Sequence, residues 1–98
     1  MQPVIHPPAA DGSVTVELAY PIQRRGVEGL TTSVTLRRAR GGDLRATLGI
    51  ANDEARGLAL VERLSGWLPA DVDALDVVDT LALCEVAGDF LTRGQPTP

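Results

Sequence analysis

The stretch LTTSVTLRRARGGDLR, residues 30–45, decides the predicted fold because it contains the change from strand to helix. In its first half, apolar and polar residues alternate, so every second residue from Leu30 to Leu36 falls on one face of a strand. Three arginines and two glycines follow, and Asp43 is then placed to accept the first free N–H groups of a helix. We therefore expect β structure before this stretch and helices after it.

A second strand is predicted upstream, over residues 14–20, whose alternating apolar side chains are Val14, Val16, Leu18 and Tyr20. Pro21 is expected to end this strand because proline has no N–H to donate. Residues 22–29 then connect the two strands as an antiparallel hairpin, which must pack on helices because an isolated hairpin is marginally stable. Residues 1–12 contain three prolines and no periodicity, so we expect a flexible arm there.

Two helices are predicted in the middle of the chain. The first runs from Asp43 to about Leu48, and the second begins at a cap formed by Asn52 or Asp53 and ends near Ser65. The second helix has a broad apolar face with charged residues opposite, which is the pattern of an amphipathic helix.

Two further helices are predicted after Gly66, which suits the left-handed residue that ends a helix. Pro69 suits the first turn of a short helix that ends near Ala74. Asp76 is expected to cap the last helix, with Asp79 in its positive first turn. The core stripe of that helix is predicted to contain Ala82, Leu83, Val86, Ala87, Phe90 and Leu91.

Together these elements predict an α+β fold, in which an N-terminal antiparallel β-hairpin packs on a small bundle of three to four α-helices. A chain of 98 residues suits one small domain, which we place at residues 13–93, followed by a flexible tail at 94–98. The core must be aliphatic, because the chain has only three aromatic residues: Tyr20, Trp67 and Phe90.

The chain offers little for catalysis, and we predict no enzymatic activity, no cofactor and no metal. His6 is the only histidine and lies in the arm, where little fixes its geometry. Cys84 is the only cysteine, which excludes an intramolecular disulfide and a cysteine-based metal site. Four aspartates, which we expect on solvent-exposed helix turns, lack the glycine that an EF-hand loop requires: Asp71, Asp73, Asp76 and Asp79.

The charges divide along the chain, although the net charge is −4. Residues 23–63 hold eight arginines against five acids, whereas residues 64–91 hold six acids and no basic residue. The acidic half repels phosphate, which argues against nucleic-acid binding. No apolar run approaches the roughly 18–20 residues that span a bilayer, and the first residues lack the pattern of a signal peptide. We therefore expect a soluble intracellular protein without membrane partners.

Five short motifs in a fixed order carry a resemblance to a known family: VTLRR (34–38), GDLR (42–45), LSGW (64–67), LPADVDALDVVD (68–79) and GDFL (88–91). In this order and spacing, the chain resembles the small tail assembly chaperones of Mu-like and P2-like tailed phages, of the E, 41 or 14 type. The resemblance covers about residues 14–92.

The resemblance implies a role without catalysis. Such proteins bind the tape measure protein, a long helical and partly apolar chain, and keep it soluble until tail-tube subunits polymerise around it. The resemblance places the protein in the cytoplasm of the bacterial host and not in the mature particle. A frameshifted longer form of the same protein is a further expected partner.

Eight residues are predicted to bind the partner: Leu60, Leu64, Trp67, Leu68, Arg37, Arg38, Asp79 and Phe90. The first four would form part of a groove for the client, led by Trp67 because large aromatics dominate interface energetics. The same apolar residues could instead be core, and the sequence leaves both interpretations open. The acidic last helix is a second candidate surface, which would attract basic clients over long range.

Two other functions remain open at this point. One is a structural component of the tail or baseplate. The other is a small DNA-binding regulator, since helices joined at Gly66 and Pro69 resemble a helix-turn-helix, although acidic residues would face the phosphates. A free hairpin edge can pair between protomers, so a homo-oligomer is also possible.

Overall fold

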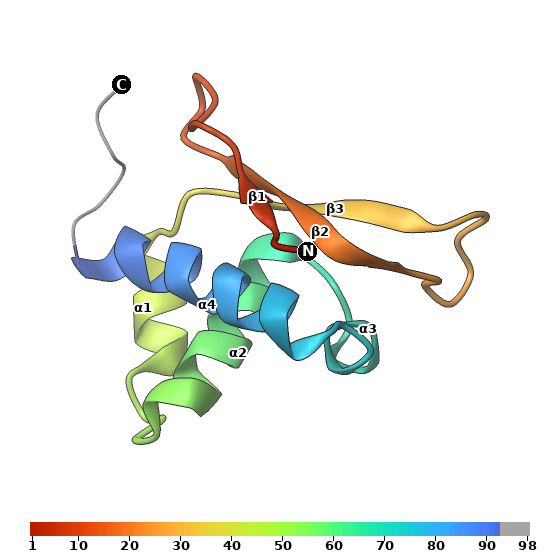
Figure 1. The fold of residues 1–98 in the computed structure, drawn as a ribbon. Helices are drawn as coiled ribbons and strands as arrows, with labels where there is room; N and C mark the ends of the chain where they lie inside the picture. Colours follow the sequence, from red (N-terminus) through yellow and green to blue (C-terminus); the bar gives the residue numbers. More distant parts are fainter. Residues whose placement is uncertain (93–98) are drawn as a thin grey trace.

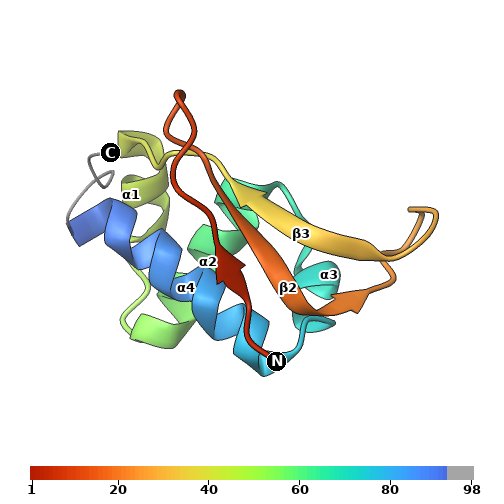
Figure 2. The same ribbon diagram turned by 45° about the horizontal axis from the view of Figure 1, so that its top comes forward.

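The computed structural model describes residues 1–92 and places strands before helices, as predicted (Figure 1). The strands are β1 (Val4–Ile5), β2 (Val14–Ile22) and β3 (Thr31–Leu36), and the helices are α1 (Gly41–Thr47), α2 (Asp53–Ser65), α3 (Pro69–Asp73) and α4 (Val77–Thr92). Figures 1 and 2 show the helices on one side of the sheet, and α4 packs on β2 while α2 packs on β3. The predicted α+β class is confirmed, while the tail predicted at 94–98 lies outside the described residues.

β1 is the element that the sequence analysis did not predict. The strands form an antiparallel sheet in the order β1-β2-β3, so β1 adds an edge strand to the predicted hairpin. β1 lies inside the expected arm and pairs only with Val16 and Glu17 of β2. Two residues are too few to show alternation, which explains why the sequence pattern did not reveal this strand.

An irregularity in β2 changes which residues face the helices. The pairing of β2 with β3 shifts register between Glu17 and Ile22. Residues 18–21 of β2 lie opposite Thr32 alone in β3, and an odd number of extra residues reverses the faces of the residues that follow. Leu18 and Ala19 are therefore both buried, whereas Tyr20 is 45% exposed. The prediction that Tyr20 lies on the apolar face is wrong for this reason.

Pro21 does not end β2, contrary to the prediction. Pairing with β3 resumes one residue later, where Ile22 lies opposite Thr31. Proline is tolerated in a strand where its missing N–H would face an open edge. At Pro21, β2 is paired with neither β1 nor β3, so the missing N–H costs the sheet no hydrogen bond. The hairpin continues past Pro21, and the loop that joins β2 to β3 projects beyond the helices (Figure 1).

The predicted ends of the later helices are confirmed. Asn52 caps α2 and accepts a backbone hydrogen bond of 2.9 Å, and Gly66 ends α2 with a φ of 75°. Pro69 lies in the first turn of α3, and Asp76 accepts a backbone N–H at 2.9 Å at the start of α4. Each of these residues acts within its own turn, which is why the sequence predicts them.

The core lies between the sheet and the helices α2 and α4. It is aliphatic, as predicted, with Trp67 and Phe90 as its aromatic members. The predicted stripe of α4 is confirmed, since its residues are buried or partly buried in this core: Ala82, Leu83, Val86, Ala87, Phe90 and Leu91. Among residues 1–92, no helix has the length and apolar character needed to cross a membrane.

Candidate functional site

The predicted groove residues separate into a buried set and an exposed one. Leu60, Leu64 and Trp67 belong to the core cluster beneath the sheet. Leu68 follows directly and is 67% exposed, because the chain turns out of α2 at Gly66. In this structure the first three residues pack as the core interpretation expects, and Leu68 is the groove residue that a partner could contact.

Trp67 is covered by an arginine from the hairpin. The guanidinium carbon of Arg24 lies 4.1 Å from the centroid of the indole ring, which is a cation–π distance. The same guanidinium places Nη2 3.5 Å from Oδ2 of Asp71 in α3. Asp71 is buried, so the expectation that it is solvent-exposed is wrong. These contacts fasten the hairpin to α3, and the sequence gives no signal for them because Arg24 and Asp71 are 47 residues apart.

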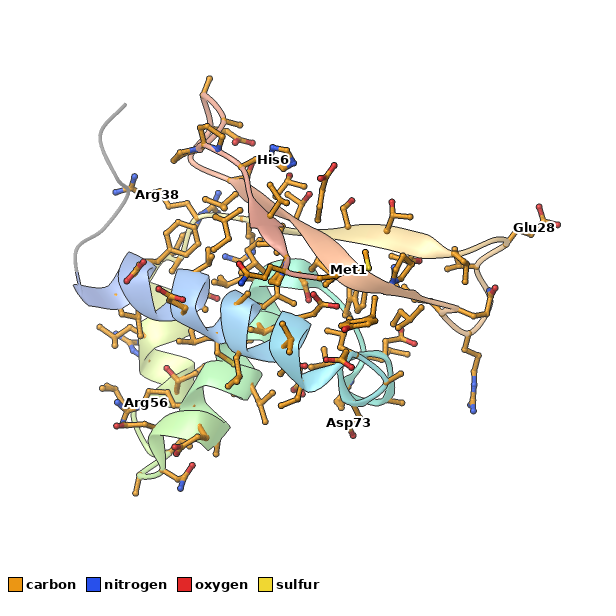
Figure 3. The ribbon with its side chains drawn as sticks, in the orientation of Figure 1. Met1, His6, Glu28, Arg38, Arg56 and Asp73 are labelled. Carbon is orange, nitrogen blue, oxygen red and sulfur yellow. The ribbon has the colours of Figure 1, made fainter. Side chains whose placement is uncertain are left out.

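Arg37 is held by a buried carboxylate. Both of its terminal nitrogens donate to Asp43 at 2.8 Å, and Nε of Arg63 donates to the same carboxylate at 3.0 Å. The paired Arg37 guanidinium is the main cause that holds the pKa of Asp43 well below its usual range, and this carboxylate in turn raises the pKa of Arg37. Arg38 is exposed and forms no ion pair within residues 1–92 (Figure 3).

Asp43 occupies a different helix position from the predicted one. α1 begins at Gly41 and its N-cap is Arg40, so Asp43 is the third helical residue. Its carboxylate accepts the backbone N–H of Arg40 at 2.8 Å, which still satisfies a free donor at the helix start. Gly41 and Gly42 form the first two residues of α1, so the N-cap is Arg40, upstream of the position predicted for Asp43.

Asp79 is fully buried, with 0% of the residue exposed. Its carboxylate accepts the backbone N–H of Ala19 at 2.8 Å and that of Tyr20 at 3.1 Å. These two amides belong to the irregular part of β2, so Asp79 joins α4 to the sheet where the pairing with β3 is interrupted. The expectation that Asp79 lies on a solvent-exposed turn is wrong, and its proposed contact with a partner would require these two hydrogen bonds to break.

The start of α4 exposes three apolar side chains, Val77, Val78 and Leu81, which we call the α4 outer face. Val77 and Leu81 are 65% and 61% exposed, and Val78 is 40% exposed. The spacings of three and four residues make these side chains neighbours on one side of the helix. The sequence analysis missed this face, although two adjacent valines outside the predicted core stripe were a signal for it.

A pocket of about 260 Å³ lies farther along α4, beneath the N-terminal arm. Residues 5–8 line it from the arm and Val14 lines it from β2. The residues that α4 contributes are Glu85, Val86, Asp89 and Phe90. Phe90, one of the predicted partner residues, therefore contributes to this pocket, while most of its surface is buried in the core.

The histidine, the cysteine and the acidic side chains considered for metal or nucleophilic chemistry lie in different surroundings of the described chain. No group of three histidine, cysteine or acidic side chains in residues 1–92 could hold a metal ion. Burial raises the pKa of the Cys84 thiol, and this cysteine packs against Gly57 of α2. Nε2 of His6 lies 3.5 Å from Oε1 of Glu17 on the outside of the sheet.

Comparison with known proteins identifies the family. The family model described as phage tail assembly chaperone proteins, E, or 41 or 14, matches residues 15–92. Searches of curated proteins and of solved structures find no match. The family match extends from β2 to the end of α4 and includes the hairpin, the core and the α4 outer face. The chain therefore belongs to the phage tail assembly chaperones of the E, 41 or 14 type.

Proposed function

We propose that this chaperone binds the tape measure protein and keeps it soluble until tail-tube subunits assemble around it. The observation that carries the proposal is the family match over residues 15–92. The proposed setting is the cytoplasm of the bacterial host, and the chaperone leaves before the particle is complete. A frameshifted longer form of the chain is proposed to take part in the same complex.

The α4 outer face and Leu68 form the proposed contact surface. A tape measure protein is a long helical and partly apolar chain, and an amphipathic helix binds through residues at three- and four-residue spacing. Val77, Val78 and Leu81 offer the same spacing on the chaperone. Full burial of one such side chain contributes about 1.5–3 kcal/mol, so a few of them suffice for a reversible complex.

Co-expression with the tape measure protein from the same phage tests the proposal. We expect the wild-type chaperone to keep that protein in the soluble fraction and to co-purify with it. The double variant Val77→Asp, Leu81→Asp should lose both effects because it places charges on the α4 outer face. Leu44→Asp, Leu48→Asp is the matched control, since these two leucines are exposed and have the same spacing, one on α1 and one at its C-cap.

The outcome that contradicts the proposal is a tape measure protein that stays insoluble beside the folded wild-type chaperone. Mass spectrometry of purified particles provides a second test. A chaperone is absent from the particle, whereas a structural component of the tail or baseplate would be present at a fixed ratio to the tube subunit.

A further inference from the structure

The pocket beneath the arm combines an apolar floor with an acidic rim. Val14, Val86 and Phe90 form the floor and belong to the buried core. Ile5 covers it from the arm and is itself 47% exposed, so apolar surface continues from the floor to the solvent. An apolar side chain that entered here would extend the core without displacing any of its members.

The rim carries two acidic side chains, and no cation of residues 1–92 pairs with either. Glu85 and Asp89 lie one turn apart on α4, where like charges repel each other. Neither forms an ion pair in the part of the chain that the structure describes. His6, the other ionisable residue of the lining, has its Nε2 3.5 Å from Glu17. A cation supplied by a ligand would relieve the repulsion between the two carboxylates.

The size of the pocket restricts the kind of ligand. Its volume of about 260 Å³ lies below the roughly 300–1,000 Å³ of pockets that enclose drug-sized molecules. It suits one large apolar side chain of a peptide, which is the form that an interface anchor takes. Nucleic acid is disfavoured because two carboxylates would face its phosphates.

From this combination we infer that the pocket receives an apolar side chain of the tape measure protein that lies next to an arginine or lysine. The apolar side chain fills the space above Val86 and Phe90, and the neighbouring cation pairs with Glu85 and Asp89. This inference rests on the proposed function and adds to it the chemical class of the segment that is bound. The pocket follows the α4 outer face along the same helix, so one client segment can contact both.

Charge reversal at the rim tests the inference with purified wild-type and variant chaperones. The probes are overlapping synthetic peptides that cover the tape measure protein of the same phage. Glu85→Lys, Asp89→Lys should lower the affinity for the bound peptide about tenfold or more, since the arginine or lysine of the peptide would then face two lysines. Ile5→Ser, at an exposed arm position, should also weaken binding by removing apolar lining.

A matched control reverses the same number of charges elsewhere. Glu28→Lys, Asp73→Lys alters two exposed acids that Figure 3 shows far from His6, one at the end of the hairpin and one on α3. We expect the control to bind the peptide within about twofold of wild type. Replacing the arginine or lysine of the peptide by alanine should weaken binding to wild type but not further weaken binding to the rim variant.

The outcomes separate this inference from the proposed function. If wild type binds the tape measure protein but the rim variant binds as tightly as the control, the inference about the pocket is overturned and the proposed function stands. If wild type binds neither the protein nor any peptide, both are overturned. A wild-type dimer that the rim variant converts to a monomer would also overturn the inference, because a second copy would then occupy the pocket.

Discussion

Replacing Asp79 tests whether a single buried carboxylate holds α4 to the sheet. In Asp79→Asn, one oxygen can still accept a backbone N–H of β2. The amide nitrogen, however, is a donor and meets the second N–H without a bond. The amides involved are those of Ala19 and Tyr20, at 2.8 and 3.1 Å from the carboxylate oxygens. The variant therefore loses one charge-assisted hydrogen bond and leaves a donor without a partner beside the core.

The expected loss follows from these two contacts. A hydrogen bond to a charged group contributes about 1.5–3 kcal/mol, so we expect Asp79→Asn to lower the free energy of unfolding by about 2–3 kcal/mol. Asp79→Ala loses both bonds and should cost about 3–5 kcal/mol. Each kcal/mol lowers Tm by roughly 4–8 °C in a domain of this size. The measurement is urea denaturation followed by the fluorescence of Trp67, the only tryptophan.

The control is Asp73→Asn, which removes an exposed carboxylate from α3 and should change stability by less than about 0.5 kcal/mol. Hydrogen exchange gives a local reading, since the amides of Ala19 and Tyr20 should exchange faster in Asp79→Asn than in the control. If Asp79→Ala is as stable as the control, or if these two amides keep their protection, the reasoning is refuted.

Three further predictions concern the other contacts. The pKa of Asp43 is lowered in the fold from its ordinary value of 3.8, so the ionised carboxylate stabilises the fold fully above about pH 4, and this stabilisation is lost as the pH falls below that value. Asp43→Asn should therefore lose less stability than wild type when both are titrated with acid. An acid transition that is the same in both proteins would contradict the prediction. Gly57→Val should lower the free energy of unfolding, measured by urea denaturation, by about 1–3 kcal/mol, because even a Cβ at Gly57 would lie 3.2 Å from Sγ of Cys84. Adding Cys84→Ala should restore part of the lost stability. Trp67→Ala should lower the free energy of unfolding by about 3–5 kcal/mol because the ring is buried. The affinity of each folded variant molecule for the tape measure protein should stay unchanged. A lower affinity of the folded fraction would show that Trp67 contacts the partner.

The sequence predicted those features of the fold that depend on neighbouring residues. Asn52, Gly66, Pro69 and Asp76 each satisfy or set the backbone of their own helix turn, and all four occupy the predicted positions. The alternation of apolar and polar residues that indicated β2 is likewise a property of one strand alone, and it holds as far as Leu18. Beyond Leu18 the register shift changes which residues face the helices, and no local pattern in the sequence indicates the shift.

The buried carboxylates could not be predicted in the same way. An aspartate in the first turn of a helix has the same local pattern whether it faces water or a distant strand. Asp79 bonds to an amide 60 residues away, and Asp71 meets an arginine 47 residues away. These positions follow from the packing of α3 and α4 against the hairpin, which the helix pattern does not contain.

Which apolar side chains are exposed could be predicted only in part, for a related reason. An apolar helix face in a sequence indicates that the face is buried, but it does not indicate whether it packs against the same chain or against a partner. The sheet covers Leu60 and Leu64, and the turn at Gly66 leaves Leu68 outside. The α4 outer face lies outside the core stripe of its helix, which was a signal in the sequence, and the packing of α4 against β2 leaves this face exposed.

The projecting loop between β2 and β3 makes the chaperone easy to label. Its two glycines, Gly26 and Gly29, have φ angles of 79° and 73°, and a Cβ at either would meet no atom within 4 Å. Arg24 fastens the hairpin to Trp67 and Asp71 just before this turn, and Gln23 and Arg24 hold the backbone of Val27 within it, so residues added after Val27 would lie beyond these contacts. A fluorophore or a short epitope placed between the glycines would allow the proposed departure of the chaperone from a growing tail to be tested and timed.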